Sequence, residues 1–127
     1  MTVRSLALED HFQHPRNVGS IPAGAPGLVQ GRVGSHGEGV LIELGLRLEG
    51  PRVAEARFKA FACGHTIACC SWVSEWVVGK SVREAEALDA ATLVVALALP
   101  ADKVRSADWA VRAVAAALRD ATPDGVK

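Results

Sequence analysis

All three cysteines of the 127-residue chain lie in one short stretch, AFACGHTIACCSW, which spans residues 60–72. His65 follows Cys63 closely, and the adjacent pair Cys69 and Cys70 comes after it. Thiolates and imidazoles bind metal ions, and thiolates also attack sulfur. Three interpretations are open: a metal site, a redox pair, or one reactive thiol followed by two packing residues.

Cys63 occupies the position at which a predicted strand passes into a predicted helix, next to Gly64, which allows a tight turn. The exposed N–H groups and the positive end of a helix dipole favour the thiolate there. A free cysteine in a globular domain is also commonly a small buried hydrophobe, so its position alone leaves that alternative open.

A hairpin places possible ligands beside Cys63. If its turn is centred near residues 50–51, paired residues have numbers that sum to about 101, so Cys63 lies across from Gly37 and Glu38, with His36 close by. One cysteine, one histidine and one glutamate form a plausible ligand set for zinc or ferrous iron, with one position left for a further ligand.

The other cysteines and histidines have a different expected role. Cys69 and Cys70 point in helical directions about 100° apart, and their spacing from Cys63 is not a recognised metal-binding spacing. We therefore expect both to pack in the core. Surface or capping roles are predicted for the remaining histidines, which are His11, His14 and His65.

Alternating hydrophobicity predicts the strands that position these residues. The segments VLIELGLRLE and VAEARFKAFA each place apolar residues on one face, with Ala54, Ala56, Phe58 and Ala60 on the inner face of the second. They form a hairpin. The Gly- and Pro-rich stretch 14–39 is predicted to be mostly loop, with one edge strand near residues 28–33.

Helical patterns flank these strands. Helices are predicted over residues 2–13, from about residue 65 to a stop at Gly79, as two short helices within 82–98, and from about 106 to 121. Asp89 and Ser106 are candidate N-caps, and Pro100 is a candidate terminator. A helix followed by strands and then by further helices predicts an α+β fold.

Composition excludes several classes of protein. The positive charges of fourteen Lys plus Arg are balanced by the negative charges of fourteen Asp plus Glu, so the net charge does not suggest a nucleic-acid-binding protein. Acidic residues interrupt the N-terminal segment too early for a signal peptide, and no apolar run reaches the length of a membrane span. We expect a soluble cytoplasmic protein that folds as a single domain over residues 1–127.

Four segments together resemble a known family. DHFQHPRNVGSIP, GSHGEGVLIEL, ARFKAFACGHTIACCSWVSEWVVGKSVREA and LPADKVRS are similar to the U-type iron–sulfur cluster scaffolds, the NifU N-terminal and IscU proteins, from about residue 5 to 118. The resemblance implies a non-enzymatic α+β scaffold with a three-stranded antiparallel sheet packed with helices. Such scaffolds receive iron and persulfide sulfur from a cysteine desulfurase, build a [2Fe–2S] cluster, and pass it to apo-protein acceptors with the help of a chaperone. Zinc can occupy the same site.

The resemblance also implies which residues form the site. Cys63 matches the middle of three ligand cysteines, His36 stands where the first cysteine is expected, and Glu38 replaces an aspartate. These three residues are the predicted metal ligands.

The third cysteine position is occupied by Ser106, with Arg105 in place of a histidine, while Lys103 is shared with the family. These three are predicted pocket residues, but serine is a poor ligand and Arg105 repels a cation. Cys69 and Cys70 are further candidate thiols only if the helix that carries them rearranges, since Cys70 lies about 10 Å along it.

Three functions follow from this altered ligand set. The first is a divergent scaffold or carrier for iron, zinc or a labile iron–sulfur cluster. The second is a degenerate scaffold that docks on a desulfurase or a chaperone, although its Leu99–Lys103 segment departs from the chaperone-recognition motif of the family. The third is a persulfide acceptor that uses Cys63 without a metal.

Overall fold

Three strands form one antiparallel sheet, as predicted, with the second strand of the chain in the middle. The structure is a computed structural model that describes residues 5–119. Its elements in chain order are α1 (Leu6–Gln13), β1 (Leu28–Ser35), the 3-10 turn η1 (His36–Glu38), β2 (Val40–Glu49), β3 (Arg52–Phe61), α2 (Gly64–Trp76), α3 (Val82–Glu86), α4 (Ala90–Leu97), the 3-10 turn η2 (Ala101–Lys103) and α5 (Val104–Arg119).

The predicted alternation is confirmed in the central strand β2, which buries every second residue: Val40, Ile42, Leu44 and Leu46. In β3 it is confirmed only in part. A register shift after Arg47 pairs Leu48 with Val53, so Val53 is buried and Ala54 is only partly buried. A bulge reverses the inward face of a strand because it inserts one residue.

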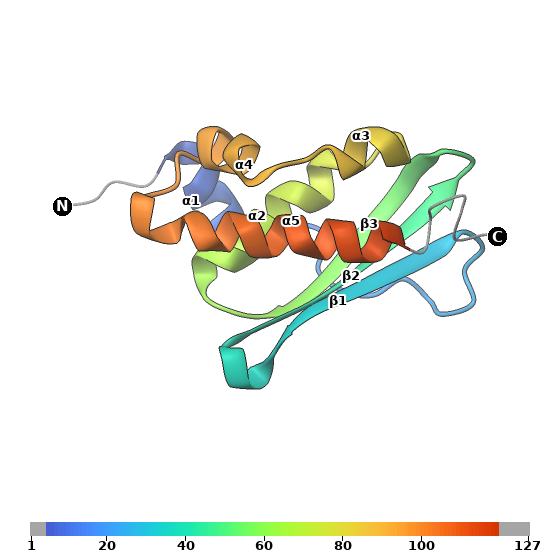
Figure 1. Ribbon diagram of the computed structural model, residues 1–127, viewed down its shortest axis with the longest axis horizontal. Helices are drawn as coiled ribbons and strands as arrows, with labels where there is room; N and C mark the ends of the chain where they lie inside the picture. Colours follow the sequence, from blue (N-terminus) through green and yellow to red (C-terminus); the bar gives the residue numbers. More distant parts are fainter. Residues whose placement is uncertain (1–4, 120–127) are drawn as a thin grey trace.

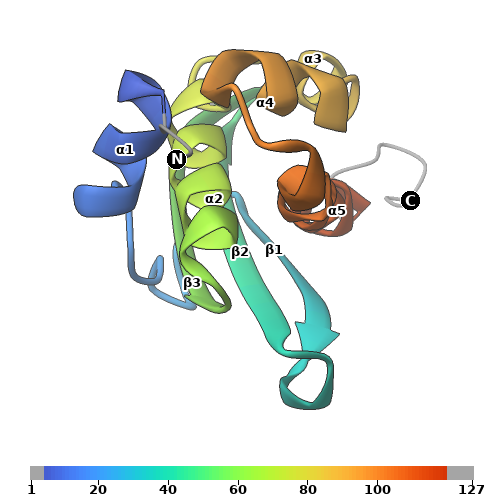
Figure 2. The same ribbon diagram turned by 90° about the vertical axis from the view of Figure 1, so that its left-hand side faces the viewer.

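Helices α2 and α5 lie on one face of this sheet, and α1, α3 and α4 surround them (Figure 1). Figure 2 shows α2 above β2 and β3, with α5 beside it above β1. Gly31 allows α5 to approach β1 closely, since a Cβ atom there would overlap the backbone of Ala116 and Ala117. The tip of the β1–β2 hairpin extends beyond the helices in both views.

Local signals set most of the helix ends. Gly79 lies in the left-handed region with φ 90°, three residues after α2 ends, and Asp89 caps α4 by accepting from the Thr92 backbone N–H. The predicted N-cap role of Ser106 is wrong, because α5 begins at Val104 and Ser106 lies inside its first turn. Residues 2–4 and 120–121 of the predicted helices lie outside the described residues.

Among residues 5–119, no helix has the length and hydrophobicity that crossing a membrane requires.

Candidate functional site around Cys63

Cys63 is exposed at the start of α2, where the chain has just left β3. Its backbone is extended, with φ −70° and ψ 163°, and it occupies the N-cap position of the helix. N-cap side chains face the free N–H groups of the first turn, where the helix dipole favours negative charge. The prediction that Cys63 stands between a strand and a helix is therefore confirmed.

Two hydroxyl groups lie beside the sulfur. Cys63 Sγ is 3.4 Å from Thr66 Oγ1, in the first turn of α2, and 3.9 Å from Ser106 Oγ, in the first turn of α5. Thr66 donates to Ser106 over 3.0 Å. Both hydroxyl-bearing residues are buried, at 4% and 5% exposure. The sulfur thus faces solvent on one side and a hydroxyl pair on the other.

Two opposing effects act on the pKa of Cys63. Partial burial raises the pKa, but the side chain and backbone N–H of Thr66, the Ser106 hydroxyl and the backbone N–H of His65 lower it, and the net shift is downward. The capping hydrogen bond itself does not form, so we attribute the contribution of the backbone N–H groups to their partial positive charge. The environment favours the thiolate, which is the nucleophilic and metal-binding form.

The Phe12 ring of α1 forms another wall of the site. It packs directly on Gly64, since a Cβ atom at that position would overlap the ring. The ring also meets His65 edge-on, with centroids 6.1 Å apart. Gly64 therefore allows α1 to cover the turn that holds Cys63.

His36 and Glu38 lie on η1, at the tip of the β1–β2 hairpin, and both are exposed. The His36 ring packs edge-on against Phe61, with centroids 4.7 Å apart, and Glu38 accepts a hydrogen bond from Ser35 Oγ over 3.1 Å. The strand ladder ends at the pair Leu41 and Phe61, so the expected pairing of the two strands does not continue to Cys63.

Within residues 5–119, no three His, Cys, Asp or Glu side chains are grouped closely enough to hold a metal ion. The ligand set of Cys63, His36 and Glu38 therefore stays a prediction, and this conformation does not assemble it. Of the predicted pocket residues, Ser106 contacts Cys63, while Arg105 is exposed on α5 and Lys103 is partly buried in η2.

Cys69 and Cys70 are buried in α2, at 0% and 4% exposure, as expected for packing residues. Burial, and to a smaller extent the charge of Cys63, raises the pKa of Cys69 to about 12, and burial raises the pKa of Cys70 further. Both thiols are protonated and inaccessible in this conformation. Their use as replacement ligands would require α2 to rearrange.

The prediction of a surface or capping role for His11 is wrong. His11 is 6% exposed and lies 2.7 Å from Ser71 Oγ through its Nδ1, while its Nε2 is 3.6 Å from Glu75 Oε1. The Arg16 backbone N–H donates to Ser71 Oγ, and Arg16 Nη1 lies 3.3 Å from His11 Nδ1. Because a guanidinium can only donate, Nδ1 is an acceptor and the Ser71 hydroxyl donates to it. Burial, followed by the positive charge of Arg16, lowers the pKa of His11. This histidine joins α1 to α2. His14 is the exposed C-cap residue of α1.

Sequence reasoning missed Thr66. Its position three residues after Cys63, which was predicted to lie where a strand passes into a helix, was a usable signal, because side chains with this spacing meet at a helix start. Its partner Ser106 is 40 residues away in the sequence, and local patterns do not reveal that contact.

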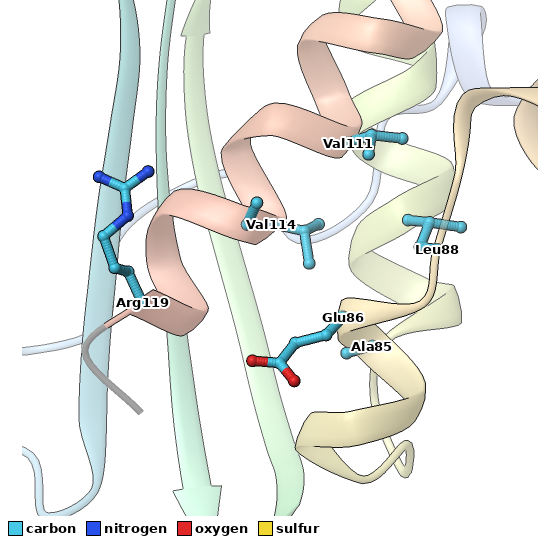
Figure 3. Close-up of a pocket in the computed structure, with 7 residues that line it drawn as sticks. Ala85, Glu86, Leu88, Val111, Val114 and Arg119 are labelled. Carbon is cyan, nitrogen blue, oxygen red and sulfur yellow. The ribbon is translucent and has the colours of Figure 1, made fainter. Parts of the chain in front are cut away.

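A cavity of about 340 Å³ lies away from these residues, between α3 and the C-terminal half of α5 (Figure 3). Its walls are mostly apolar and include Ala85, Leu88, Val111 and Val114, with Glu86 and Arg119 at its rim. None of the residues discussed around Cys63 lines it.

Comparison with known proteins gave concordant matches. A family model described as the NifU-like N-terminal domain matches residues 5–122. The iron–sulfur cluster assembly scaffold protein IscU of Buchnera aphidicola (subsp. Acyrthosiphon pisum) is 38% identical over 117 residues, which cover 91% of this chain and 92% of the relative. The Escherichia coli (strain K12) IscU is 38% identical over 112 residues, which cover 87% of this chain and 88% of the relative.

Solved structures agree on the fold. The N-terminal part of a NifU-like protein from Brucella abortus superposes with a TM-score of 0.70 at 16% identity, covering 91% of each chain. A putative iron–sulfur cluster assembly scaffold protein for the SUF system of Fervidobacterium islandicum AW-1 has a TM-score of 0.66 at 15% identity, covering 90% of this chain and 95% of that one. At these identities the likeness concerns the fold alone.

Proposed function

Because the chain belongs to the NifU-like N-terminal domain family, we propose that it is an iron–sulfur cluster assembly scaffold or carrier whose central thiol is Cys63. The observation that carries this proposal is the placement of Cys63. Alone among the three thiols it is exposed, and it stands at a helix start that favours its thiolate. The two buried thiols, Cys69 and Cys70, are not accessible to incoming iron or sulfur.

The cargo that the site takes is iron, or a [2Fe–2S] cluster, with zinc as an alternative occupant. Clusters are held by thiolates, with histidine as a substitute on one iron in some centres. Since Cys63 is the single exposed thiol, we infer that His36 and Glu38 approach it when iron binds, and that another subunit or an external thiol completes the coordination. Such a site holds its cargo weakly and passes it on.

A second candidate is a persulfide acceptor that needs no metal. The contact of Cys63 with two hydroxyl groups favours it, since one of them belongs to Ser106, at the position that matches the third cysteine of the family. A hydroxyl donates a hydrogen bond to sulfur, but it is a poor ligand for iron. The two candidates are compatible if sulfur arrives on Cys63 before iron.

The protein partners proposed from the family are a cysteine desulfurase, a chaperone and apo-protein acceptors, and docking without cluster assembly remains the alternative. The chain would act as a non-enzymatic carrier. In the Leu99–Lys103 segment, Leu99 is buried and the last three residues form η2. We infer that this segment must unfold locally before a chaperone can bind it. The cytoplasmic location and the single domain over residues 1–127 stay predictions.

Anaerobic reconstitution tests the scaffold proposal. The purified protein is incubated with ferrous iron, cysteine and a cysteine desulfurase, and iron, sulfide and visible absorption are measured. We expect bound iron and sulfide with charge-transfer absorption in the wild type and a loss of both in Cys63→Ser. Cys70→Ala is the matched control, because it removes a buried thiol of the same stretch and should retain the cargo.

The outcomes separate the candidates. A colourless protein without bound sulfide, in which mass spectrometry finds added sulfur on Cys63, supports the persulfide acceptor and contradicts cluster assembly. If neither a cluster nor added sulfur is found, docking on a desulfurase or a chaperone is the function that remains. Equal iron content in the wild type and in Cys63→Ser would show that Cys63 is not the site.

A further inference from the structure

Thr66 and Ser106 are two buried hydroxyl residues that meet at the sulfur of Cys63. They come from different helices, α2 and α5, and their hydroxyl oxygens are 3.0 Å apart with Thr66 as the donor. At 4% and 5% exposure, neither side chain has free access to bulk water. A buried hydroxyl whose hydrogen has no acceptor destabilises the folded protein, so the direction of each hydrogen matters.

One hydroxyl hydrogen, that of Ser106, can be directed at the sulfur. Because Thr66 gives its hydrogen to Ser106, the hydrogen of Ser106 needs another acceptor. Among the described residues, the remaining side-chain contact of Ser106 is Cys63 Sγ, at 3.9 Å. That distance is long for a hydrogen bond, and an atom attached to the sulfur can lie closer to the donor. The Ser106 hydroxyl is therefore placed to donate a hydrogen bond to an atom bound to Cys63 Sγ.

We propose, resting on the sulfur-accepting role put forward above, that Thr66 and Ser106 are positioning residues that hold the terminal sulfur of a persulfide formed on Cys63. An S–S bond is about 2.05 Å long. The added sulfur is therefore within reach of hydroxyls that lie 3.4 and 3.9 Å from Cys63 Sγ. The hydrogen bond from Ser106, whose oxygen accepts from Thr66, holds this sulfur between α2 and α5.

The transfer step balances without an external oxidant. The Cys63 thiolate attacks the terminal sulfur of a donor hydropersulfide, R–S–SH, and a new S–S bond forms to Cys63 while the S–S bond of the donor breaks. The electron pair of the broken bond leaves with the donor as the thiolate R–S⁻, and the proton stays on the transferred sulfur. The products are Cys63–S–SH and R–S⁻. Loss of the proton gives a terminal anion that accepts the hydrogen bond of Ser106, while the hydrogen of Thr66 stays on Ser106 Oγ and orients that hydroxyl.

A hydroxyl pair suits a persulfide on Cys63 better than a second thiolate would. Hydrogen bonds to charged acceptors are stronger than those between neutral groups. A second thiolate would repel the persulfide anion, whereas a hydroxyl attracts it. The pair therefore favours retention of a single sulfur on Cys63.

Sulfur exchange with glutathione hydropersulfide tests this proposal. The protein is equilibrated anaerobically, at fixed pH, with glutathione hydropersulfide and glutathione at several ratios. Peptide mass spectrometry then gives the exchange constant for sulfur on Cys63. We expect Thr66→Val and Ser106→Ala each to lower this constant about tenfold, which corresponds to about 1.4 kcal/mol. Thr66→Ser, which keeps the hydroxyl, should remain within about twofold of the wild type.

Ser74→Ala is the matched structural control. It removes a buried hydroxyl from the same helix, about 16 Å along the axis from Cys63. We expect it to lower thermal stability without changing the exchange constant. Circular dichroism identifies any variant that fails to fold, and Thr66→Ser then carries the comparison.

The outcomes distinguish this inference from the function on which it rests. If the wild type takes up sulfur on Cys63 and the exchange constant is the same in all variants, the positioning role is refuted and sulfur acceptance stands. If the wild type takes up no sulfur on Cys63, sulfur acceptance itself fails and the inference fails with it. An equal loss in Thr66→Ser and Thr66→Val would indicate a packing role for the Thr66 methyl group and overturn the hydrogen-bond role.

Discussion

Replacing Ser106 by cysteine should create a two-thiolate metal site with Cys63. Two thiolates on one tetrahedral zinc ion, each about 2.3 Å from the metal, are about 3.8 Å apart. Cys63 Sγ and Ser106 Oγ are 3.9 Å apart. The two positions are thus already spaced for a shared ion, and the substitution supplies the missing ligand without movement of α2 or α5.

The size of the effect follows from the kind of ligand that is added. Removing a hydrogen-bond partner that merely supports a metal ligand changes affinity by about 10- to 100-fold. A new thiolate contacts the metal directly, so we expect Ser106→Cys to tighten zinc binding by about 100-fold or more, or about 2.8 kcal/mol. The hydrogen bond from Thr66 to Ser106 becomes weaker in the variant, and a loss of about 1 kcal/mol of folding stability is expected.

Competition with a chromophoric zinc chelator under anaerobic conditions measures this affinity. Ser106→Ala should not bind more tightly than the wild type, and the double variant Cys63→Ser with Ser106→Cys should lose most of the gain. If Ser106→Cys binds zinc within about threefold of the wild type while it remains folded, the tetrahedral spacing is wrong and Ser106 does not face the metal position.

Three further substitutions test how the fold holds the site. Gly64→Ala should lower the free energy of unfolding by about 1–3 kcal/mol, measured with urea, because its Cβ overlaps the Phe12 ring; combining it with Phe12→Ala should recover part of the loss, and a stabilised single variant would contradict the contact. His11→Gln tests pH dependence. The lowered pKa of His11 means that the unfolded chain binds more protons below about pH 6.5, so the wild type should lose stability as pH falls from there, with a shallower loss in the variant. Equal slopes would contradict the buried histidine. Gly31→Ala should cost about 3 kcal/mol or more, since its Cβ overlaps the α5 backbone; a thermal midpoint near that of the wild type would refute the close approach.

Local patterns predicted the parts of the fold that local physics determines. The period-two pattern placed Ile42 and Leu46 inward, and Asp89 marked the start of α4. The bulge near Val53 could not be predicted from the sequence, because one inserted residue hardly changes the composition of a strand. The strands and most helices could therefore be predicted from the sequence, but which residues of β3 face the core could not.

The site was only partly predictable for a similar reason. The helix-start position of Cys63 and the burial of Cys70 follow from the helical pattern. The burial of His11 does not, because it depends on Ser71, 60 residues away. The contact of Ser106 with Thr66 likewise joins two helices, and the sequence suggested a capping role because serine is common at helix starts.

The burial of Cys69 and Cys70 also determines how this protein responds to oxidants. If Cys63 is oxidised to a sulfenic acid, the thiols best placed in sequence to resolve it are enclosed in the core. A disulfide at Cys63 then requires a small-molecule thiol or a cysteine of another protein. The oxidation state of Cys63 will therefore follow the thiol pool around the protein, with no internal disulfide to protect it from over-oxidation.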